Sequence, residues 1–243
     1  MGEVICVLSG KGGTGKTTIS AALATCLAKD GKRVLCIDAD IGLRNLDIAL
    51  GMTDQPAIAF TDVLRGDHTL KNAAKHPKLP TLSLLTAPFR IQDLDLDAFG
   101  KLLKEVRKSY DFCLIDAPAG IGKGFQLASH YADHCLVVST PDPASMRDAG
   151  RAAELLRLDG KQELHLIVNR ITKKMFSKMK LTVDDMMDGV GLPLLGIVPE
   201  DPEVVLAAAS GQALIFTTND GAAEACLRIS RRLCGALTPL MKL

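Results

Sequence analysis

Residues 9–18 read Ser9-Gly10-Lys11-Gly12-Gly13-Thr14-Gly15-Lys16-Thr17-Thr18. This stretch fits the phosphate-binding pattern G-x-x-x-x-G-K-[ST], with Gly10 and Gly15 as its two glycines and Lys16 and Thr17 at its end. The apolar run at 4–8 predicts a strand before the pattern, and the alanine- and leucine-rich run at 19–28 predicts a helix after it. A strand, a glycine turn and a helix start are the context that this motif requires.

The loop has the chemistry of a nucleotide-phosphate site. Glycines let backbone N–H groups close around phosphate oxygens, and the start of a helix adds positive potential. We expect Lys16 to reach the β- and γ-phosphates and the Thr17 hydroxyl to bind Mg²⁺. The expected nucleotide contacts in this loop are Gly10, Lys11, Gly12, Gly13, Thr14, Gly15, Lys16, Thr17 and Thr18.

A second lysine in the loop, Lys11, is not needed by an ordinary phosphate loop. We expect its ammonium group to point away from the γ-phosphate pocket of its own chain. Its natural use is then across a subunit boundary, where it would neutralise charge on a partner's nucleotide as an arginine finger does in trans. The alternative is a solvated surface lysine.

The composition is that of a globular enzyme from a reducing compartment. The chain has 243 residues, 47% of them apolar, and a formal net charge of +1, which makes non-specific binding of DNA unlikely on charge grounds. None of its seven cysteines forms a C-x-x-C pair, and four lie in strand-like apolar runs. The first predicted strand begins at residue 3, so we expect no signal peptide and a cytoplasmic protein.

Apolar strands alternate with helical stretches along the whole chain. Strands are predicted at 3–8, 33–38, 81–86, 112–116, 134–140, 163–169 and 194–198. Helices are predicted at 16–29, 57–65, 96–109, 144–158, 183–187, 203–210 and 221–237. This order predicts an α/β fold with a doubly wound, mostly parallel sheet and helices on both faces, as in P-loop NTPases. We expect a single domain over 1–237 and a short tail over 238–243.

Two further loops follow strands on the edge of the sheet where ligands bind. Asp38 and Asp40 follow one strand, and we expect Asp40 to position the attacking water with support from Asp38; the alternative is that both acids only cap the strand end. Asp116 follows four apolar residues in a Walker B pattern and should bind Mg²⁺, directly or through water. Gly120 and Gly122 give the next segment freedom to move when the γ-phosphate leaves.

Residues 11–17 resemble the deviant Walker A box, K-G-G-x-G-K-[ST], of the MinD and ParA group of ATPases. The runs at 40–47, 118–121, 168–170 and 195–201 resemble the septum-site-determining ATPase (MinD) family, in its order and spacing over nearly the whole chain. The resemblance implies an ATP-dependent homodimer that holds two ATP molecules with Mg²⁺ between its subunits and hydrolyses ATP to ADP and phosphate. It also implies a role in septum-site selection, with septum-inhibitor and topological-specificity proteins as partners.

The same resemblance implies where the adenine lies. It assigns adenine contacts to the Asn169 side chain and to the loop of Pro199, Glu200 and Asp201, and it places Arg170 beside them. Three features depart from the family pattern: Gly122 and Lys123 replace a Glu, Gly150 replaces an acid, and the chain stops at Leu243 without the usual basic amphipathic helix. A weak peripheral contact with the inner face of the cell membrane stays open, because the last residues mix basic and large apolar side chains.

Several alternative functions fit the same loop. A ParA-like partitioning ATPase would bind DNA through a basic surface, and a flagellar-number regulator would carry a different cargo. An ATP-gated scaffold would hardly turn over. An iron–sulfur carrier of this fold would need cysteines near the switch segments, and residues 116–124 contain none.

Overall fold

The computed structural model describes residues 1–41, 43–88, 95–179 and 182–242. Gly42 and Leu243, which belong to the predicted 40–47 motif and to the tail, lie outside the described residues.

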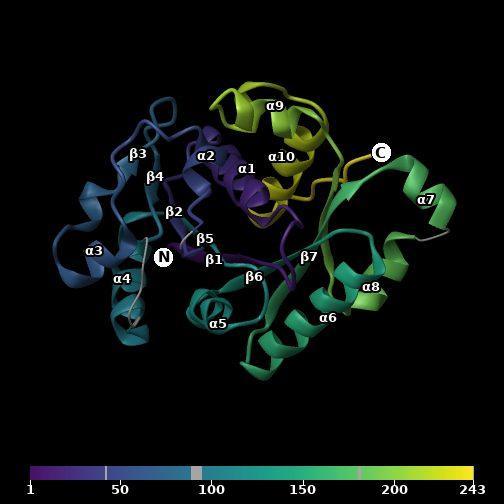
Figure 1. Ribbon diagram of the computed structural model, residues 1–243, viewed down its shortest axis with the longest axis horizontal. Helices are drawn as coiled ribbons and strands as arrows, with labels where there is room; N and C mark the ends of the chain where they lie inside the picture. The colour runs from purple at the N-terminus through teal and green to yellow at the C-terminus, as the bar shows by residue number, and fades with distance from the viewer. Residues whose placement is uncertain (42, 89–94, 180–181, 243) are drawn as a thin grey trace.

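Eight strands of the described residues form one sheet in the order β3-β4-β2-β5-β1-β6-β7-β8 (Figure 1). All neighbouring strands pair in parallel except β3, which is antiparallel to β4 at one edge. The strands are β1 (Glu3–Leu8), β2 (Val34–Asp38), β3 (Ala74–Lys75), β4 (Leu82–Leu85), β5 (Phe112–Asp116), β6 (His134–Ser139), β7 (Glu163–Ile171) and β8 (Leu194–Pro199). The predicted fold class is confirmed.

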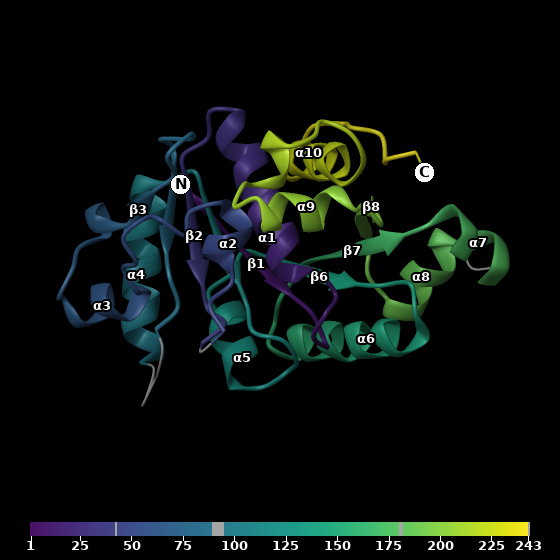
Figure 2. The ribbon, with the colours of Figure 1, turned by 45° about the horizontal axis from the view of Figure 1, so that its top comes forward.

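Helices cover both faces of this sheet (Figure 2). They are α1 (Lys16–Lys29), α2 (Leu46–Leu50), α3 (Phe60–Arg65), α4 (Leu96–Ser109), α5 (Lys123–His130), α6 (Pro143–Leu158), α7 (Lys173–Met179), α8 (Val183–Val190), α9 (Glu203–Ala209) and α10 (Gly221–Leu233), with 3₁₀ turns at Leu70–Asn72 and Leu214–Phe216. One layer contains α1, α2, α9 and α10, and the other contains α3, α4, α5, α6 and α8.

The continuous apolar strands are explained by these two layers. In β2, Leu35 and Ile37 pack into the core under α4, whereas Val34 and Cys36 pack into the core under α1. Because both faces of the strand are buried, every residue of β2 has to be apolar until Asp38, where the strand reaches the ligand-binding edge.

Three predicted helices differ in extent from the structure by three residues or more, and one of them, expected at 183–187, continues to Val190. The helix expected at 57–65 begins only at Phe60, because the preceding residues are extended and pair beside β4: Thr86 N–H donates to the Ile58 carbonyl at 2.8 Å. The helix expected at 221–237 ends at Leu233, where the chain turns through Gly235 in a left-handed conformation (φ 79°). Six short elements of the described residues were not predicted: α2, β3, α5, α7 and the two 3₁₀ turns.

The residues after α10 lie on the domain instead of extending it as a helix. Arg232 Nη1 donates to the Thr238 carbonyl at 3.0 Å, and Arg228 Nη1 donates to the Pro239 carbonyl at 3.3 Å. Met241 is partly buried against the core, whereas Leu237 is fully exposed.

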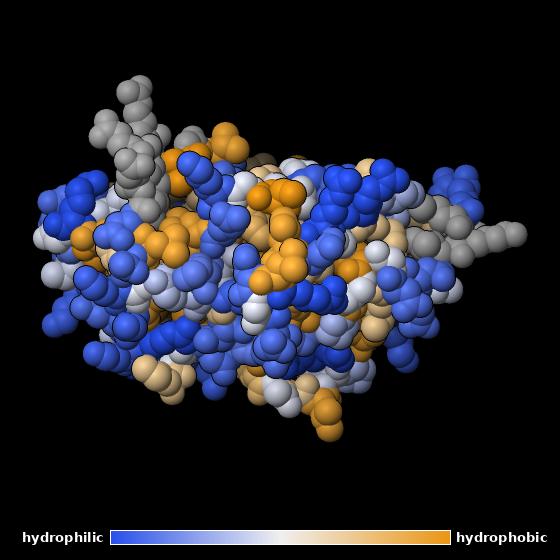
Figure 3. All heavy atoms as spheres, turned by 90° about the horizontal axis from the view of Figure 1, so that it is seen from below, coloured by the Kyte–Doolittle hydropathy of each residue, from blue (hydrophilic) through white to orange (hydrophobic). Residues whose placement is uncertain are grey.

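Within the described residues, no helix is both long and apolar enough to cross a membrane. The side of the molecule shown in Figure 3 is mostly hydrophilic, and its hydrophobic residues gather in separate patches.

Candidate nucleotide-binding site

The phosphate loop connects β1 to α1 at the carboxyl end of the sheet. Gly13 and Gly15 both take left-handed backbone conformations, with φ of 82° and 91°, which favour glycine. A Cβ atom on Gly13 would meet nothing within 4 Å, so the loop encloses open space there. The glycines therefore form a concave backbone surface in front of the first turn of α1.

The first glycine of the motif, Gly10, allows close packing of the loop on α6. A Cβ atom on Gly10 would lie 2.2 Å from the main-chain oxygen of Asp148 in α6. Only glycine allows the loop and α6 to approach this closely, so the loop is held against a helix that begins more than a hundred residues later.

Side chains brace the same loop from within. Asn169, at the end of β7, donates from Nδ2 to the Thr14 carbonyl at 2.8 Å, and Ser9 Oγ donates to the Lys11 carbonyl at 2.7 Å. The Thr14 hydroxyl is buried and has no hydrogen-bond partner among the described residues. A buried polar atom of this kind indicates that a ligand supplies the missing partner.

Asp116 lies at the end of β5, directly beside the first turn of α1. Thr17 Oγ1 donates to its Oδ2 at 2.7 Å and Ser20 Oγ donates to its Oδ1 at 2.8 Å. Burial raises the pKa of Asp116 to about 6 even though these two hydroxyls favour the ionised form. A nearly buried carboxylate next to a hydroxyl is a donor set that suits Mg²⁺.

The two aspartates after β2 have different surroundings. Asp38 is buried and accepts backbone N–H groups of Asp40 at 2.9 Å and Leu46 at 3.2 Å, so it fixes the turn that leads into α2. Burial raises its pKa to about 7. Asp40 is partly exposed; burial raises its pKa, and the ammonium group of Lys16 lowers it. Asp40 is thus the more exposed of the two acids and lies in the field of the buried Lys16, and Asp38 shapes the loop that carries it.

Lys11 is held by its own chain. Its Nζ lies 3.1 Å from Oδ1 of Asp142, and both side chains are about one third exposed, at 35% and 41%. Asp142 is the N-cap of α6 and also accepts from Thr140 Oγ1 at 2.6 Å, which helps to lower its pKa to about 2 against the effect of burial. Asp142 was not predicted as a partner of Lys11, because the two residues are 131 positions apart.

A cavity of about 420 Å³ opens beside the phosphate loop. Its wall includes the predicted residues Gly13, Gly15, Thr18, Asn169, Arg170, Pro199, Glu200 and Asp201. Its floor is apolar and was not predicted: it is formed by α1, α9 and α10 through Ile19, Ala22, Val204, Ala207 and Cys226. An apolar cavity with a polar rim next to a phosphate loop has the shape and chemistry to take a purine base.

The rim residues are tied together. Arg170 donates from Nε to Glu200 at 2.9 Å and from Nη1 to the Gly13 carbonyl at 3.4 Å, and its backbone is left-handed (φ 61°). Asp201 accepts the backbone N–H groups of Glu203 and Ala222 at 2.9 and 2.8 Å, so it joins the starts of α9 and α10. Asp201 therefore positions the cavity wall instead of offering a free carboxylate.

Two departures from the family pattern have local explanations. Gly122 is the N-cap of α5 and Lys123 its first residue, both in open surroundings where a Cβ on Gly122 would meet nothing within 4 Å. Gly150 lies on the side of α6 that packs on α8, and a Cβ there would lie 3.5 Å from the Gly189 carbonyl. A longer acidic side chain at 150 would meet α8.

Comparison with known proteins agrees with this site. A family model described as the CobQ/CobB/MinD/ParA nucleotide binding domain matches residues 5–215. The septum site-determining protein MinD of Bacillus subtilis is 36% identical over 100% of this chain and 93% of its own length, and that of Synechocystis is 36% identical over 99% and 92%.

Solved structures give the same result. The MinC:MinD cell division protein complex of Aquifex aeolicus contains a chain that is 40% identical, with a TM-score of 0.92 over 99% of this chain and 98% of that one. The MinD of Pyrococcus horikoshii, solved in complex with Mg-ADP, is 28% identical with a TM-score of 0.83 over 96% of each chain.

The doubly wound sheet, the glycine loop and the Thr17–Asp116 pair define a P-loop nucleotide-binding protein. Within that class, the extra lysine in the loop is typical of the MinD and ParA group. The chain belongs to the MinD family of septum site-determining proteins.

Proposed function

We propose that this protein is a MinD-type ATPase: a switch that dimerises on ATP, hydrolyses it to ADP and phosphate, and positions cell division. The observation that carries the proposal is the position of Lys11 in the phosphate loop. Its ammonium group is partly exposed and forms an ion pair with the partly exposed carboxylate of Asp142. Lys11 can therefore leave Asp142 and pair with another anion. Lys11 is not required to neutralise phosphate charge in its own subunit, because the buried Lys16 can do so there.

The residues of the site fit Mg²⁺ and ATP. The Gly13–Gly15 backbone and the unpartnered Thr14 hydroxyl would receive phosphate oxygens, and Thr17 and Asp116 would hold the metal. A Mg²⁺ ion held there would offset negative charge on the phosphates. Lys16 would neutralise the same charge from within the subunit, and Lys11 would do so from the partner subunit.

Asp40 is the residue proposed to orient the attacking water, and Asp38 holds the backbone of Asp40 in place. Phosphoryl transfer depends mainly on positioning and electrostatics, and we propose that these supply most of the catalysis here. We therefore expect slow turnover in the absence of an activating partner.

The adenine is proposed to lie in the 420 Å³ cavity, against Ile19, Ala22 and Cys226. Asn169, Arg170 and the Pro199–Asp201 loop form the rim that would select it. Since Asn169 Nδ2 already bonds to the Thr14 carbonyl, we expect this amide to link the base pocket to the phosphate loop instead of serving the base alone.

The proposed partners are a second copy of the chain, a septum-inhibitor protein and a topological-specificity protein. The start of α6 is the proposed surface for them, since Arg147 is exposed and Asp148 half-exposed beside the loop. The proposed place of action is the cytoplasm. A membrane contact through the tail would require Thr238 and Pro239 to leave Arg232 and Arg228, and co-sedimentation with anionic vesicles in ATP and in ADP tests it.

The test of the main proposal is Lys11→Ala, with Lys101→Ala on the exposed side of α4 as the matched control. Sedimentation in Mg·ATP should give dimers for the wild type and the control, and monomers for Lys11→Ala, with hydrolysis lost together with the dimer. Circular dichroism should show that all three are equally folded. If Lys11→Ala hydrolysed ATP at the wild-type rate, the proposed role of Lys11 across the subunit boundary would be refuted. If the wild-type protein bound ATP but did not hydrolyse it, the scaffold alternative would be favoured.

A further inference from the structure

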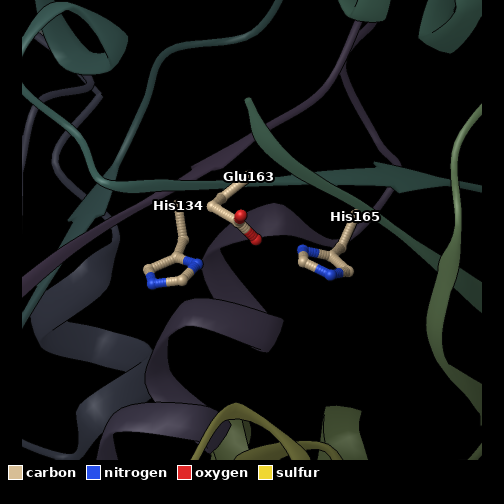
Figure 4. Close-up of side chains that lie close together, drawn as sticks. All are labelled: His134, Glu163 and His165. Carbon is tan, nitrogen blue, oxygen red and sulfur yellow. The ribbon is translucent and has the colours of Figure 1, made fainter. Parts of the chain in front are cut away.

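A second cluster of potential ligands lies at the opposite edge of the sheet from the phosphate loop. It consists of His134 at the start of β6 and of Glu163 and His165 at the start of β7. One ligand atom from each of the three side chains lies within 4.8 Å of the others. Figure 4 shows the Glu163 carboxylate between the two imidazole rings.

The strand register explains why these side chains meet. His134 pairs with Glu163 and Leu136 pairs with His165 in the parallel β6–β7 ladder. Since alternate residues of a strand share a face, all three side chains project from the same face of the sheet. Leu136 packs in the core under α1 and α10, so the cluster lies on that face where the helical layer ends.

The surroundings of the cluster add a second carboxylate. Glu3 of β1, the other neighbour of β6, has its Oε2 3.5 Å from Nε2 of His134. The side chains of His134 and Glu3 are 26% and 47% exposed, so the cluster is open to ions from solution. Glu3 and Glu163 together bring two negative charges to two imidazoles.

One histidine nitrogen in the cluster lacks a partner. His165 Nδ1 is buried and has no hydrogen-bond partner among the described residues. The nearby guanidinium of Arg232 is turned to backbone carbonyls, with Nη2 3.4 Å from the Leu194 oxygen and Nη1 3.0 Å from the Thr238 oxygen. The single positive charge of Arg232 opposes a bound cation, and the two carboxylates outweigh it.

We propose that His134, Glu163 and His165 form a binding site for a divalent transition-metal ion of the zinc class, with Glu3 oriented toward His134 as a supporting carboxylate. Two imidazoles and one carboxylate are the ligands that zinc takes when a fourth position is left to water. Magnesium and calcium prefer oxygen ligands alone, so this donor set selects against them.

The distances allow the site to close with side-chain rotations alone. Ligands at about 2.1 Å from a tetrahedral zinc ion lie about 3.4 Å from one another. The three ligand atoms, now within 4.8 Å of one another, need to approach by up to about 1.4 Å, and the exposed Glu163 carboxylate can supply most of that movement. A bound ion would join β6 to β7 at their starts, beside the hollow between His165 and the Thr238–Pro239 segment. It would stabilise the fold without involving the nucleotide.

The experiment uses the full chain, treated with EDTA, dialysed, and kept free of nucleotide and magnesium. Cobalt(II) replaces zinc as a spectroscopic probe, because its visible absorption reports coordination number and ligand type. Zinc is then added in a thermal-unfolding series. The variants are Glu163→Gln and His165→Asn, and the controls are His130→Gln, an exposed histidine outside the cluster, and Cys234→Ser, the exposed cysteine.

The proposal expects one cobalt ion per chain with the spectrum of nitrogen and oxygen ligands, and a midpoint that rises by about 5–10 °C when zinc is at a hundred times its dissociation constant. Affinity should fall at least tenfold in Glu163→Gln and His165→Asn and stay unchanged in both controls. Glu163→Gln is the decisive variant, because its exposed side chain can change without disturbing the core. No binding by the wild type, equal binding by Glu163→Gln, or a thiolate band that disappears in Cys234→Ser would each overturn the proposal.

Discussion

Nζ of Lys11 lies 3.1 Å from Oδ1 of Asp142 in the same chain. The lysine that the proposed function assigns to the partner's nucleotide therefore has an anionic partner before any second subunit arrives. Dimerisation would exchange one anion for another instead of creating a new ion pair from a solvated lysine. The strength of the dimer then depends on the difference between the two contacts.

The first prediction concerns this exchange. Asp142→Asn should release Lys11 while keeping the N-cap of α6, since asparagine also accepts the Ser145 N–H. A partly exposed ion pair is worth about 0.2–1 kcal/mol, so each Lys11 that is released should make the ATP-bound dimer about 1.4- to fivefold tighter. Sedimentation equilibrium in Mg·ATP measures this. Asp159→Asn at the other end of α6 is the control for lost charge, and a weaker dimer in folded Asp142→Asn would contradict the prediction.

The second prediction separates metal binding from nucleotide binding. Thr17→Ala removes the hydroxyl 2.7 Å from Asp116, and Ser20→Ala removes the hydroxyl 2.8 Å from its other oxygen. Only Thr17 belongs to the phosphate loop. The measurement is a titration with a fluorescent nucleotide, with and without Mg²⁺. In Mg²⁺, the affinity for nucleotide should fall at least tenfold in Thr17→Ala and stay unchanged in Ser20→Ala. Equal losses in the two variants would mean that Thr17 acts only by positioning Asp116.

The third prediction is a pH dependence of stability in the nucleotide-free protein. Burial raises the pKa of Asp38 to about 7 and that of Asp116 to about 6, so both carboxyl groups hold a proton more tightly in the folded chain than in the unfolded one. Their stabilising effect is complete below about pH 4 and is lost as the pH rises through 6 to 7. The melting temperature should therefore fall between pH 5 and pH 7 through these groups and change little through them at higher pH.

Asp38→Asn should reduce the fall in melting temperature with pH. Loss of a carboxylate oxygen that accepts a backbone N–H group can lower the melting temperature of this variant at every pH, but it does not change the slope. Asp111→Asn is the control, because the hydrogen bond from Arg33 lowers the pKa of Asp111 to about 2 and its contribution is already constant above pH 5. Calorimetry at five pH values measures the slopes. An Asp38→Asn slope equal to that of the wild type would show that this carboxyl group does not titrate in the range.

The fourth prediction tests the contact between the base pocket and the loop. A Cβ on Gly15 would lie 2.3 Å from Asn169 Nδ2, and Gly15 has φ of 91°. Gly15→Ala should lose nucleotide binding by two orders of magnitude or more. The double variant Gly15→Ala with Asn169→Ala removes the collision but not the backbone strain of about 1–2 kcal/mol, so it should recover part of the affinity. Isothermal titration with ADP is the measurement, and no recovery would assign the whole effect to the backbone.

Local patterns were sufficient to predict the main elements of this fold. The β1 and α1 bounds were predicted as the structure has them, because a buried apolar strand, a glycine loop and an alanine-rich helix are each encoded by neighbouring residues. The edge strand β3 was missed since two residues carry no periodicity, and α2 was missed since its five residues follow a turn that the side chain of Asp38 fixes.

The site was predictable where its chemistry lies in a motif and not where it depends on distant contacts. Lys16, Thr17 and Asp116 could be found from spacing, and the structure brings them together. The partner of Lys11 could not be found from spacing, because Asp142 is 131 residues away. An aspartate at a helix N-cap is common, so the position of Asp142 did not indicate a contact with the loop. Ser20 was within reach of sequence reasoning, since it follows Thr17 by three residues and so lies on the same side of α1. The apolar floor of the cavity could not be predicted, because its residues come from three helices, α1, α9 and α10, that lie far apart in the sequence.

The close approach of Gly10 to the backbone of Asp148 has one more consequence. Because no side chain separates the loop from α6, there is no soft layer to absorb a displacement of either. A protein that pressed on the outer surface of α6 would therefore shift the loop almost rigidly, and a change in the loop would reach the outer surface just as directly. In this molecule the phosphate loop and α6 meet directly at Gly10 and Asp148 and through the Lys11–Asp142 ion pair, so a displacement of one element would pass to the other.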